Sequence, residues 1–284
     1  MPVVITRTVA ELRAALDGTT AEAGTVAFVP TMGALHEGHL ALVAEAKRQA
    51  ETVVVSIFVN ALQFSQPADL ERYPRDLEAD VAMLEPVGVD IVFAPEAAEL
   101  YPTWPIETTV KAGPVGSLYE GRSRPGHFDG VLTIVAKLLN IVRPGVVVFG
   151  QKDAQQVFLV QRMVADLNVP VRVEVVETVR EDDGLARSSR NRFLDARERR
   201  AARVLSTALE AAASSADRGI DAVIAAAQSV LMGENLVELD YLTVVVPATF
   251  LPVDDDYRGP AVVLIAARVG STRLIDNEAI HLGG

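Results

Sequence analysis

Short apolar, β-branched runs alternate with amphipathic stretches along the first part of the chain. The runs are Val26–Val29, Val53–Val59, Asp90–Ala94, Val146–Phe149 and Val171–Val176, and the stretches with helical spacing are Gly38–Ala50, Leu77–Glu85, Val131–Ile141 and Gln155–Asp166. Runs that are apolar on both faces are typical of parallel strands covered by helices on two sides. The alternation predicts an α/β fold with a doubly wound parallel sheet, in which ligands bind beyond the C-terminal ends of the strands.

Two departures from this alternation divide the chain. Residues 96–130 are rich in proline and glycine, and we expect a long functional loop there with a short strand at Thr108–Lys111. After about residue 177, Asp195 and Glu198 predict a capping box that opens an alanine-rich helix to about Ser214. A helix at Asp221–Met232 and strands at Val237–Val246, Ala261–Val269 and Thr272–Ile275 are expected to follow. The pattern predicts a first domain over residues 1–177 and a smaller C-terminal α+β domain over 178–284.

Composition narrows the classes of function. The chain has 284 residues, of which 50% are hydrophobic and 23% charged, as in a folded globular protein. It has no cysteine, which excludes disulfides, thiolate zinc sites, iron–sulfur clusters and a cysteine nucleophile. The net charge of -12 argues against nucleic acid or an anionic membrane as a partner. The longest apolar run, Ala261–Ala267, is too short to span a bilayer, and Arg7, Glu11 and Arg13 interrupt any signal-peptide pattern, so we expect a cytoplasmic protein.

The turn after the first apolar run contains the first candidate site, PTMGALHEGH from Pro30 to His39. Its glycines let backbone amides approach a ligand, and the helix that begins near Gly38 adds free N–H groups and a positive dipole end. His36 and His39 can donate to phosphate oxygens or stabilise the charge that develops in nucleotidyl transfer. Two alternatives are a capped helix start with incidental histidines, and a hydrolytic zinc site with His127 as a third ligand.

Two further polar segments carry phosphate-binding chemistry. Gly150 permits a tight turn, Lys152 places a point charge against a phosphate, and Asp153 can bind a ribose hydroxyl or Mg²⁺. A polar turn capped by Asp153 is the alternative. In the segment 187–190, two serine hydroxyls lie between two arginines, and this set can stabilise a leaving pyrophosphate. A solvated loop explains that segment equally well.

A fourth candidate site follows the second apolar run. Asn60 and Gln63 can orient a hydroxyl or a carboxylate without adding charge, although a plain turn with a satisfied asparagine is as good an explanation. Weaker candidates for the same pocket are Tyr73, Arg124, His127 and Gln156. The chain lacks a Gly-x-Ser-x-Gly elbow as well as a cysteine nucleophile, which disfavours a covalent acyl-enzyme. The inventory indicates catalysis by positioning and electrostatics on a nucleotide.

Together these segments resemble the pantoate–β-alanine ligase (pantothenate synthetase) family of the His-x-Gly-His nucleotidyl-transferase superfamily. The matching blocks cover essentially the whole chain and are Pro30–Leu40, Ser56–Phe64, Tyr73–Arg75, Arg124–Gly130, Arg143–Gln156, Arg180–Asn191 and Arg273–Asn277. The resemblance implies a Rossmann-like N-terminal domain that binds ATP and pantoate, a smaller C-terminal lid domain, dependence on Mg²⁺, and a cytoplasmic homodimer.

The resemblance also implies a reaction in two steps. ATP and (R)-pantoate give pantoyl adenylate and pyrophosphate, and the amine of β-alanine then releases AMP and pantothenate. The implied ATP-site residues are Met32, Gly33, Ala34, Leu35, His36, Glu37, Gly38, His39, Gly150, Gln151, Lys152, Asp153, Val179, Arg187, Ser188, Ser189 and Arg190. Those implied to be catalytic are His36, His39 (as proton donor), Lys152, Ser188, Ser189 and Arg190. Gln63 and Gln156 are implied to hold pantoate, with Gln63 also near β-alanine, while Asn60 and Tyr73 shape the pocket.

Two positions depart from the family pattern. Ala61 stands where proline is usual, which relaxes Asn60, and we expect a looser turn and weaker pantoate binding with activity retained. Arg187 stands where an apolar residue is common, and we expect it to be tolerated because the contact there is mainly through the backbone. The alternatives to the ligase are an adenylyltransferase acting on another small acid or a phosphorylated metabolite, and a nucleotide-binding regulatory protein.

Overall fold

The structure is a computed structural model of the chain and describes residues 3–18 and 26–283. The chain divides into two compact units. The first unit contains Met1–Gly150 and Gln156–Val176, and the second contains Gln151–Gln155 and Glu177–Gly284. The short segment Gln151–Gln155 therefore belongs to the second unit, although its neighbours in the sequence on both sides belong to the first.

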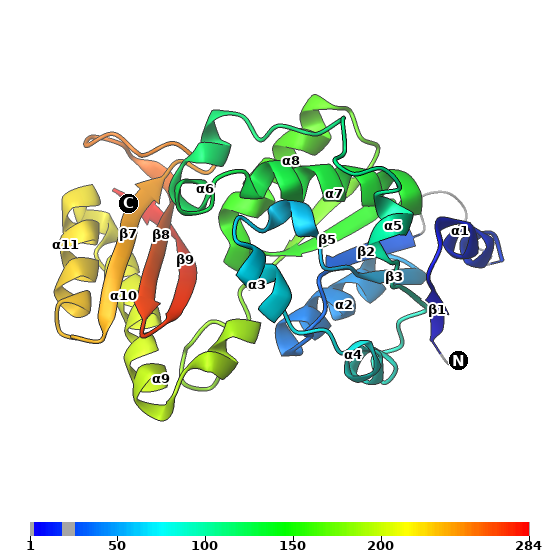
Figure 1. Cartoon of the computed structure of the whole chain (residues 1–284). Helices are drawn as coiled ribbons and strands as arrows, with labels where there is room; N and C mark the ends of the chain where they lie inside the picture. The colour runs from blue at the N-terminus through cyan, green and yellow to red at the C-terminus, as the bar shows by residue number, and fades with distance from the viewer. Residues whose placement is uncertain (1–2, 19–25, 284) are drawn as a thin grey trace. The chain divides into compact units, whose positions relative to one another are not determined.

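A parallel sheet forms the centre of the first unit (Figure 1). Its strands are β1 (Val4–Thr6), β2 (Val26–Thr31), β3 (Thr52–Ile57), β4 (Ile91–Phe93), β5 (Val146–Gly150) and β6 (Arg172–Val176), in the order β1-β4-β3-β2-β5-β6. From β2 the chain winds outward through β3 to β4, and then returns beside β2 to wind the other way through β5 to β6. This confirms the predicted doubly wound sheet.

The direction of winding reverses between β2 and β5, where Ala27 pairs with Val146 and Phe28 pairs with Val147. Because both strands run in the same direction, the turns that follow them leave the sheet at the same edge, side by side. The turn that contains His36 follows β2, and Gly150 ends β5. The fold therefore brings these two predicted ATP-site segments of the first unit to the position where doubly wound sheets bind ligands.

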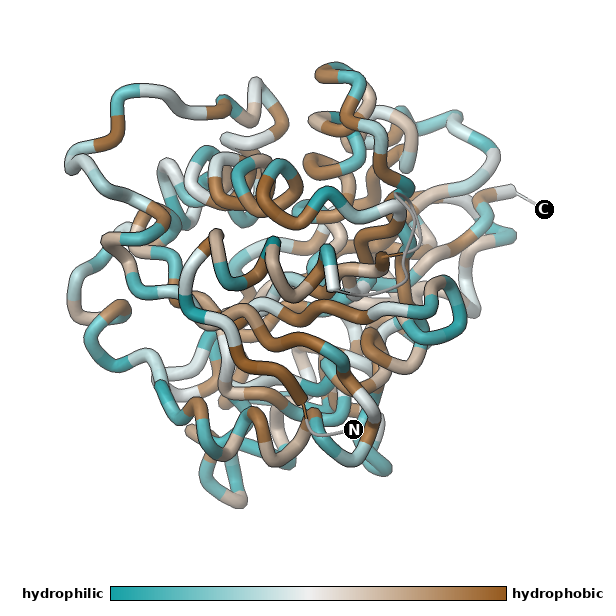
Figure 2. The backbone as a smooth tube through the Cα atoms, turned by 90° about the vertical axis from the view of Figure 1, so that its right-hand side faces the viewer, coloured by the Kyte–Doolittle hydropathy of each residue, from teal (hydrophilic) through white to brown (hydrophobic). Residues whose placement is uncertain are grey.

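Both faces of the parallel sheet are buried, because successive residues of a strand point to opposite faces. On β2, Val26 and Phe28 pack in one apolar cluster, and Ala27 and Val29 pack in another. The first cluster is completed by α1 (Val9–Asp17), α7 (His127–Val142) and α8 (Ala154–Asp166), and the second by α2 (Glu37–Gln49) and α4 (Leu77–Leu84). The burial explains the continuous apolar runs, which are brown in Figure 2.

The segment 96–130 is irregular as predicted, but it has no strand at Thr108–Lys111, so that prediction was wrong. The backbone N–H of Val110 donates to Thr133 Oγ1 (3.0 Å), and that of Ala112 donates to Asp129 Oδ1 (2.9 Å). The stretch thus pairs with side chains of α7 in place of a neighbouring strand. The short elements here and in the preceding loop are η1 (Ala61–Gln63), α3 (Pro67–Arg72), α5 (Ala97–Leu100), η2 (Pro114–Ser117) and α6 (Tyr119–Ser123).

In the second unit, helices pack on an antiparallel sheet. Its strands are β7 (Val237–Val245), β8 (Gly259–Val269) and β9 (Thr272–Leu282), and its helical elements are η3 (Gln151–Asp153), η4 (Ser189–Phe193), α9 (Ala196–Ala202), α10 (Val204–Ala213), η5 (Ala216–Arg218) and α11 (Ile220–Leu231). The predicted smaller α+β region is confirmed. The last strand is longer than predicted because β9 pairs with β8 along its length, from Thr272 opposite Val269 to Leu282 opposite Gly259.

The capping box of Asp195 and Glu198 is present, but the predicted single helix to Ser214 is two helices. The break lies at Arg203, whose carbonyl oxygen accepts hydrogen bonds from the hydroxyls of Ser206 (2.9 Å) and Thr207 (3.3 Å). Hydroxyl groups that compete in this way for a helix carbonyl are known to bend and interrupt helices.

Candidate functional site

The turn between β2 and α2 has a backbone shape that needs glycine. Gly33 has φ 79° and Ala34 has φ 53°, both in the left-handed region. A Cβ atom on Gly33 would lie 2.7 Å from Asp80 Oδ2 and 3.1 Å from Ile57 Cγ2. Position 33 therefore requires glycine both for its φ angle and for the room that a side chain would fill.

A buried carboxylate on α4 holds this turn. Asp80 is 4% exposed, and it accepts hydrogen bonds from the backbone N–H groups of Ala34 (3.0 Å) and Leu35 (2.8 Å). Bonds from two amides to one ionised carboxylate are charge-assisted and short. Asp80 was not predicted from the sequence. The available signal was its helical spacing from Leu77 and Leu84, which places a carboxylate on the apolar face of the helix, where an unpaired charge is not tolerated.

The two histidines of the motif are oriented by the start of α2. The backbone N–H of Gly38 donates to His36 Nδ1 (3.1 Å), and the backbone N–H of His36 donates to His39 Nδ1 (3.2 Å). The ring centroids lie 4.2 Å apart. A ring nitrogen that accepts a hydrogen bond carries no proton, so each neutral imidazole has its proton on Nε2. The capping role and donation to a phosphate therefore use different atoms, and the two interpretations are compatible.

The turn after β3 presents Asn60 and Gln63, which are 1% and 7% exposed. Asn60 Nδ2 donates to Gln63 Oε1 (3.0 Å) and to the carbonyl oxygen of Gly130 (3.1 Å), and the hydroxyl of Tyr101 donates to Asn60 Oδ1 (2.8 Å). Asn60 is thus a satisfied turn residue, and it also holds Gln63 in one orientation. A Cβ on Gly130 would lie 2.3 Å from the carbonyl oxygen of Leu62, so the turn and α7 touch through their backbones.

The weaker candidates of this pocket differ in where the structure places them. His127 Nδ1 lies 2.8 Å from the carbonyl oxygen of Gln63, and Arg124 Nη1 donates to His127 Nε2 (3.1 Å). Since the arginine always donates, the His127 proton is on Nδ1 and points to Gln63. Tyr73 is linked instead to the first turn, its hydroxyl lying 3.5 Å from the carbonyl oxygen of Gly33. Gln156 is half-buried on α8.

Across residues 3–18 and 26–283, no three His, Cys, Asp or Glu side chains are grouped so that they could hold a metal ion. In the same residues, no helix combines the length and hydropathy needed to cross a bilayer.

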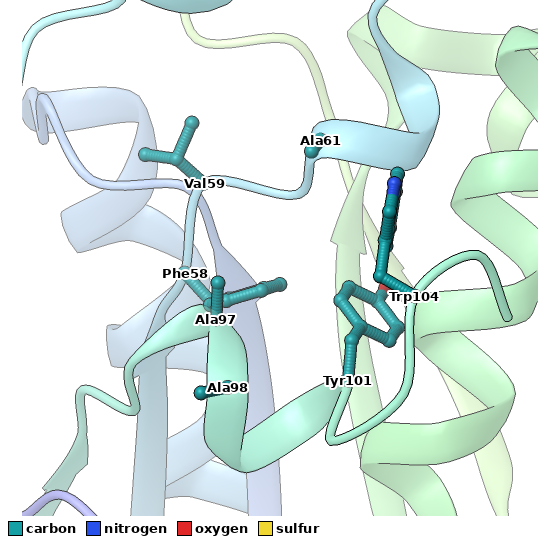
Figure 3. Close-up of a pocket in the computed structure, with 7 residues that line it drawn as sticks. All are labelled: Phe58, Val59, Ala61, Ala97, Ala98, Tyr101 and Trp104. Atoms are coloured by element: carbon teal, nitrogen blue, oxygen red, sulfur yellow. The ribbon is translucent and has the colours of Figure 1, made fainter.

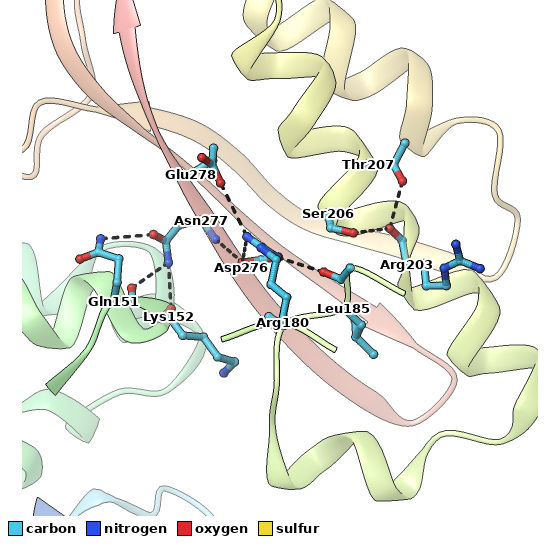
Figure 4. A network of polar contacts seen from close by, with 12 residues as sticks. Gln151, Lys152, Arg180, Leu185, Arg203, Ser206, Thr207, Asp276, Asn277 and Glu278 are labelled. Carbon is cyan, nitrogen blue, oxygen red and sulfur yellow. Dashed lines mark hydrogen bonds and ion pairs between the residues drawn. The ribbon is translucent and has the colours of Figure 1, made fainter. Parts of the chain in front are cut away.

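In the second unit, a single amide side chain holds the turn that carries Lys152 (Figure 4). Asn277 Nδ2 on β9 donates to the carbonyl oxygens of Gln151 (2.9 Å) and Lys152 (3.0 Å), and Gln151 Nε2 donates back to Asn277 Oδ1 (3.3 Å). Asn277 is buried. The preceding residue, Asp276, accepts two hydrogen bonds from Arg180 (2.6 and 3.2 Å). Adjacent positions of β9 thus anchor η3 and the segment that begins at Arg180.

The segment predicted to clamp pyrophosphate is an ordered turn. Arg180 and Ala186 form an antiparallel bridge, and the N–H of Arg187 donates to the carbonyl oxygen of Val179 (2.9 Å), so these two predicted ATP-site residues lie together. Ser188 Oγ caps η4 by accepting from the N–H of Arg190 (3.2 Å). Ser189 is the first residue of η4, and the Arg190 side chain is exposed.

A partly buried network around Asn191, below η4, fixes this turn. Asn191 Nδ2 donates to Glu181 Oε1 (2.8 Å) and to the carbonyl oxygen of Ala186 (3.1 Å). Arg199 donates to Glu181 Oε2 (2.7 Å) and to Asp183 Oδ2 (3.1 Å). The hydrogen bond from Arg199, followed by that from Asn191, lowers the pKa of the Glu181 carboxyl although partial burial opposes this. A freely solvated loop, the alternative interpretation, does not describe the segment.

Comparison with known proteins identifies relatives over nearly the whole length of the chain. Residues 4–279 match the family described as pantoate-beta-alanine ligase. Pantothenate synthetase of Leifsonia xyli is 60% identical over 92% of this chain and 91% of its own. The crystal structure of pantothenate synthetase from Thermus thermophilus superposes with a TM-score of 0.90 at 46% identity, covering 97% of this chain and 99% of the other.

A third relative carries ligands. It is pantoate-beta-alanine ligase from Francisella tularensis, complexed with beta-gamma ATP and beta-alanine, which superposes with a TM-score of 0.80 at 31% identity and covers 97% of each chain. The family match, the identities and the shared fold agree over nearly the full chain. The chain belongs to the pantoate–β-alanine ligase family.

Proposed function

We propose that this protein condenses (R)-pantoate with β-alanine at the expense of ATP, through a pantoyl-adenylate intermediate. Membership of the family supports the reaction, and the ATP and β-alanine held by the Francisella relative support two of the three substrates. The observation that carries the proposal is the pair of imidazoles at the start of α2. Their Nδ1 atoms are engaged in the cap, so both Nε2–H groups serve as donors at a positive helix end beside the switch point of the sheet.

In the first step, a carboxylate oxygen of pantoate attacks the α-phosphorus of ATP. A new phosphorus–oxygen bond forms, the bond to the β-phosphate bridging oxygen breaks, and pyrophosphate leaves with the electron pair. The Nε2–H groups of His36 and His39 donate to phosphate oxygens as charge builds on them. Lys152, Ser188, Ser189 and Arg190 stabilise the leaving pyrophosphate. Met32–His39, Gly150–Asp153, Val179 and Arg187 complete the ATP-binding set.

In the second step, the amine of β-alanine attacks the acyl carbon of the adenylate. The carbon–nitrogen bond forms, the bond to the AMP oxygen breaks, and the amine loses a proton. Gln63 and Gln156 hold the pantoyl group, with Asn60 and Tyr73 shaping the pocket. These roles need no covalent enzyme intermediate, in keeping with a chain that has no cysteine.

Mg²⁺ is the proposed counter-ion of ATP. It is a hard cation that is usually bound by substrate phosphates and one or two protein carboxylates. Asp153 fits that requirement, because it is the exposed carboxylate on the η3 turn beside Lys152. When bound, Mg²⁺ neutralises charge on the triphosphate.

We also propose a cytoplasmic homodimer in which residues 1–177 bind ATP and pantoate and residues 178–284 act as a smaller lid domain. The absence of cysteine supports a reducing compartment. Size-exclusion chromatography with light scattering tests the dimer.

The reaction is tested by pyrophosphate release from ATP and Mg²⁺ with (R)-pantoate, with and without β-alanine. We expect sustained turnover with both substrates and at most one equivalent per site with pantoate alone. The His39→Ala variant should show a much lower adenylation rate. The His281→Gln variant, which replaces an exposed histidine on β9, should keep the wild-type rate. Sustained release without β-alanine would indicate an adenylyltransferase with another acceptor, and ATP binding without release would indicate a regulatory protein.

A further inference from the structure

We propose that Tyr101 is a positioning residue for the acid substrate. Its hydroxyl donates to the Asn60 amide oxygen and, together with the backbone groups of Gly130 and Leu62, holds the Asn60 amide in one orientation. Asn60 in turn sets the orientation of the Gln63 amide, so that Gln63 offers N–H donors and no acceptor to the substrate. The inference rests on the proposed function, because Gln63 is taken to bind pantoate. It adds to the pocket the residue that directly follows the C-terminal end of α5.

The orientation of Asn60 follows from two backbone groups of fixed polarity. The carbonyl oxygen of Gly130 can only accept, and it lies 3.1 Å from one end of the amide, which must therefore be Nδ2. The backbone N–H of Leu62 can only donate, and it lies 3.3 Å from the other end, which must be Oδ1. The hydroxyl of Tyr101 lies 2.8 Å from Oδ1, so it is the donor of that bond.

The orientation of Gln63 follows from that of Asn60. The second hydrogen on Asn60 Nδ2 points to the Gln63 amide at 3.0 Å, and this partner must be the oxygen, Oε1. Gln63 Nε2 is therefore turned away from Asn60. Among the described residues, Nε2 has no protein acceptor, although the side chain is 7% exposed. A nearly enclosed pair of N–H donors suits a carboxylate or a hydroxyl oxygen of a small acid.

Packing holds the Tyr101 ring at the position that makes this hydroxyl bond possible (Figure 3). The ring contacts Phe58 and Trp104 edge to face, with centroids 5.9 and 6.1 Å away, and Lys137 Nζ lies 5.7 Å from its centroid. Tyr101 also lines an apolar cavity of about 280 Å³ that Ala61 borders. Burial raises the pKa of the Tyr101 hydroxyl, which keeps it protonated and able to donate.

The test is Tyr101→Phe, which keeps the ring and removes the donor. We expect the KM for pantoate to rise about five- to tenfold, as for the loss of one hydrogen bond of roughly 1 kcal/mol, with kcat and the KM for ATP changed less than about twofold. Tyr257→Phe is the matched control, because it removes a tyrosine hydroxyl that donates to the carbonyl oxygen of Pro260 (2.9 Å) in the second unit. Its KM for pantoate should equal that of the wild type.

A double-mutant cycle with Gln63→Ala separates positioning from general packing. If Tyr101 acts through Gln63, Tyr101→Phe should produce no further rise in the KM for pantoate when Gln63 is already alanine. An equal rise in the KM for pantoate with Gln63 and with alanine at position 63 would overturn the proposal. A rise in the KM for ATP as large as that for pantoate would overturn it too. A wild-type enzyme without pantoate-dependent pyrophosphate release would instead overturn the proposed function.

A second variant tests the orientation of Gln63 if Tyr101→Phe does not fold. Gln63→Glu keeps an oxygen for Asn60 but presents a second oxygen to the substrate in place of Nε2. We expect the KM for pantoate to rise more than tenfold, because two carboxylates would face each other. A KM for pantoate unchanged in this variant would show that Gln63 offers its oxygen to the substrate, and would contradict the proposal.

Discussion

The turn after β2 and the turn at Gln151–Asp153 are both proposed to bind phosphates, but they are held by groups of opposite polarity. In the first, the carboxylate of Asp80 accepts from backbone N–H groups of Ala34 and Leu35. In the second, the amide of Asn277 donates to backbone carbonyl groups of Gln151 and Lys152. The first arrangement fixes the residues before the histidines, and the second engages the carbonyl oxygens of the turn that carries Lys152. One buried side chain can thus preorganise a turn either by accepting from its backbone N–H groups or by donating to its backbone carbonyl groups.

The largest effect is expected for Asp80→Ala. It leaves two backbone N–H groups buried without their acceptor, which should cost about 2–4 kcal/mol in the free energy of unfolding. Displacement of His36 and His39 by about 1 Å should lower the adenylation rate about a hundredfold. Urea unfolding and pyrophosphate release measure the two effects. The control is Asp76→Ala, which removes only the cap of the same helix, and an equal rate loss in that variant would contradict the role of Asp80.

The glycine of the first turn and the glycine that precedes the second turn should respond differently to alanine. Gly33→Ala meets Asp80 Oδ2 at 2.7 Å and places alanine at a φ of 79°, and we expect a loss of about 2–3 kcal/mol in stability. Gly150→Ala meets only Leu42 Cδ2 at 3.8 Å, an ordinary contact, and should change stability by less than about 1 kcal/mol. Thermal unfolding of both variants is the measurement, and similar losses would show that the two turns are equally constrained.

Asn277→Ala should have a smaller effect than Asp80→Ala, because the turn carbonyls of Gln151 and Lys152 are only partly buried and can bind water instead. We expect a fall of about tenfold in the adenylation rate, equivalent to about 1.4 kcal/mol, as the turn that carries Lys152 loosens. Ala279→Ser, at an exposed position of the same strand, is the control. An unchanged rate in Asn277→Ala would mean that Lys152 does not depend on this anchor.

The smallest effect concerns the dependence of stability on pH in the network below η4. Hydrogen bonding from Arg199 lowers the pKa of Glu181 below its ordinary value of 4.5 in the folded protein. The resulting stabilisation is fully present above pH 4.5 and is lost as the pH falls through the folded-state pKa. Wild type should therefore lose stability relative to Glu181→Gln below that pH. Melting temperatures of both proteins across an acid series measure this, and a constant difference would refute it.

Local patterns were sufficient to predict most of the first unit and its His-x-Gly-His turn. The apolar runs predicted β2 to β6, and the glycines and histidines lie within a few residues of the backbone groups that they arrange. Asp80 escaped prediction because its partners are remote in the sequence. The edge strand β1 was missed because Val4–Thr6 is too short to show a period.

Prediction was less complete where contacts with residues far away in the sequence determine the local structure. The strand expected at Thr108–Lys111 is absent because side chains of α7 satisfy that backbone, which no local pattern reveals. Asn277 and Tyr101 likewise act on residues far away in the chain, at Lys152 and Asn60. The resemblance pointed to the block around Asn277, but only the structure shows its hydrogen bonds. Whether Ala61 weakens pantoate binding stays a prediction, since Asn60 is held by groups other than residue 61.

Because Gln151–Gln155 belongs to the second unit, the two units are not contiguous segments of the sequence, which matters for producing them as separate fragments. A gene fragment that begins at Glu177 would encode β9 and Asn277 without the carbonyl groups that Asn277 binds. A fragment that ends at Val176 would contain Gln151 and Lys152 without Asn277. No single cut in the coding sequence separates the two units exactly, so a second unit that begins at Glu177 would require a peptide spanning Gln151–Gln155 to be supplied or grafted on.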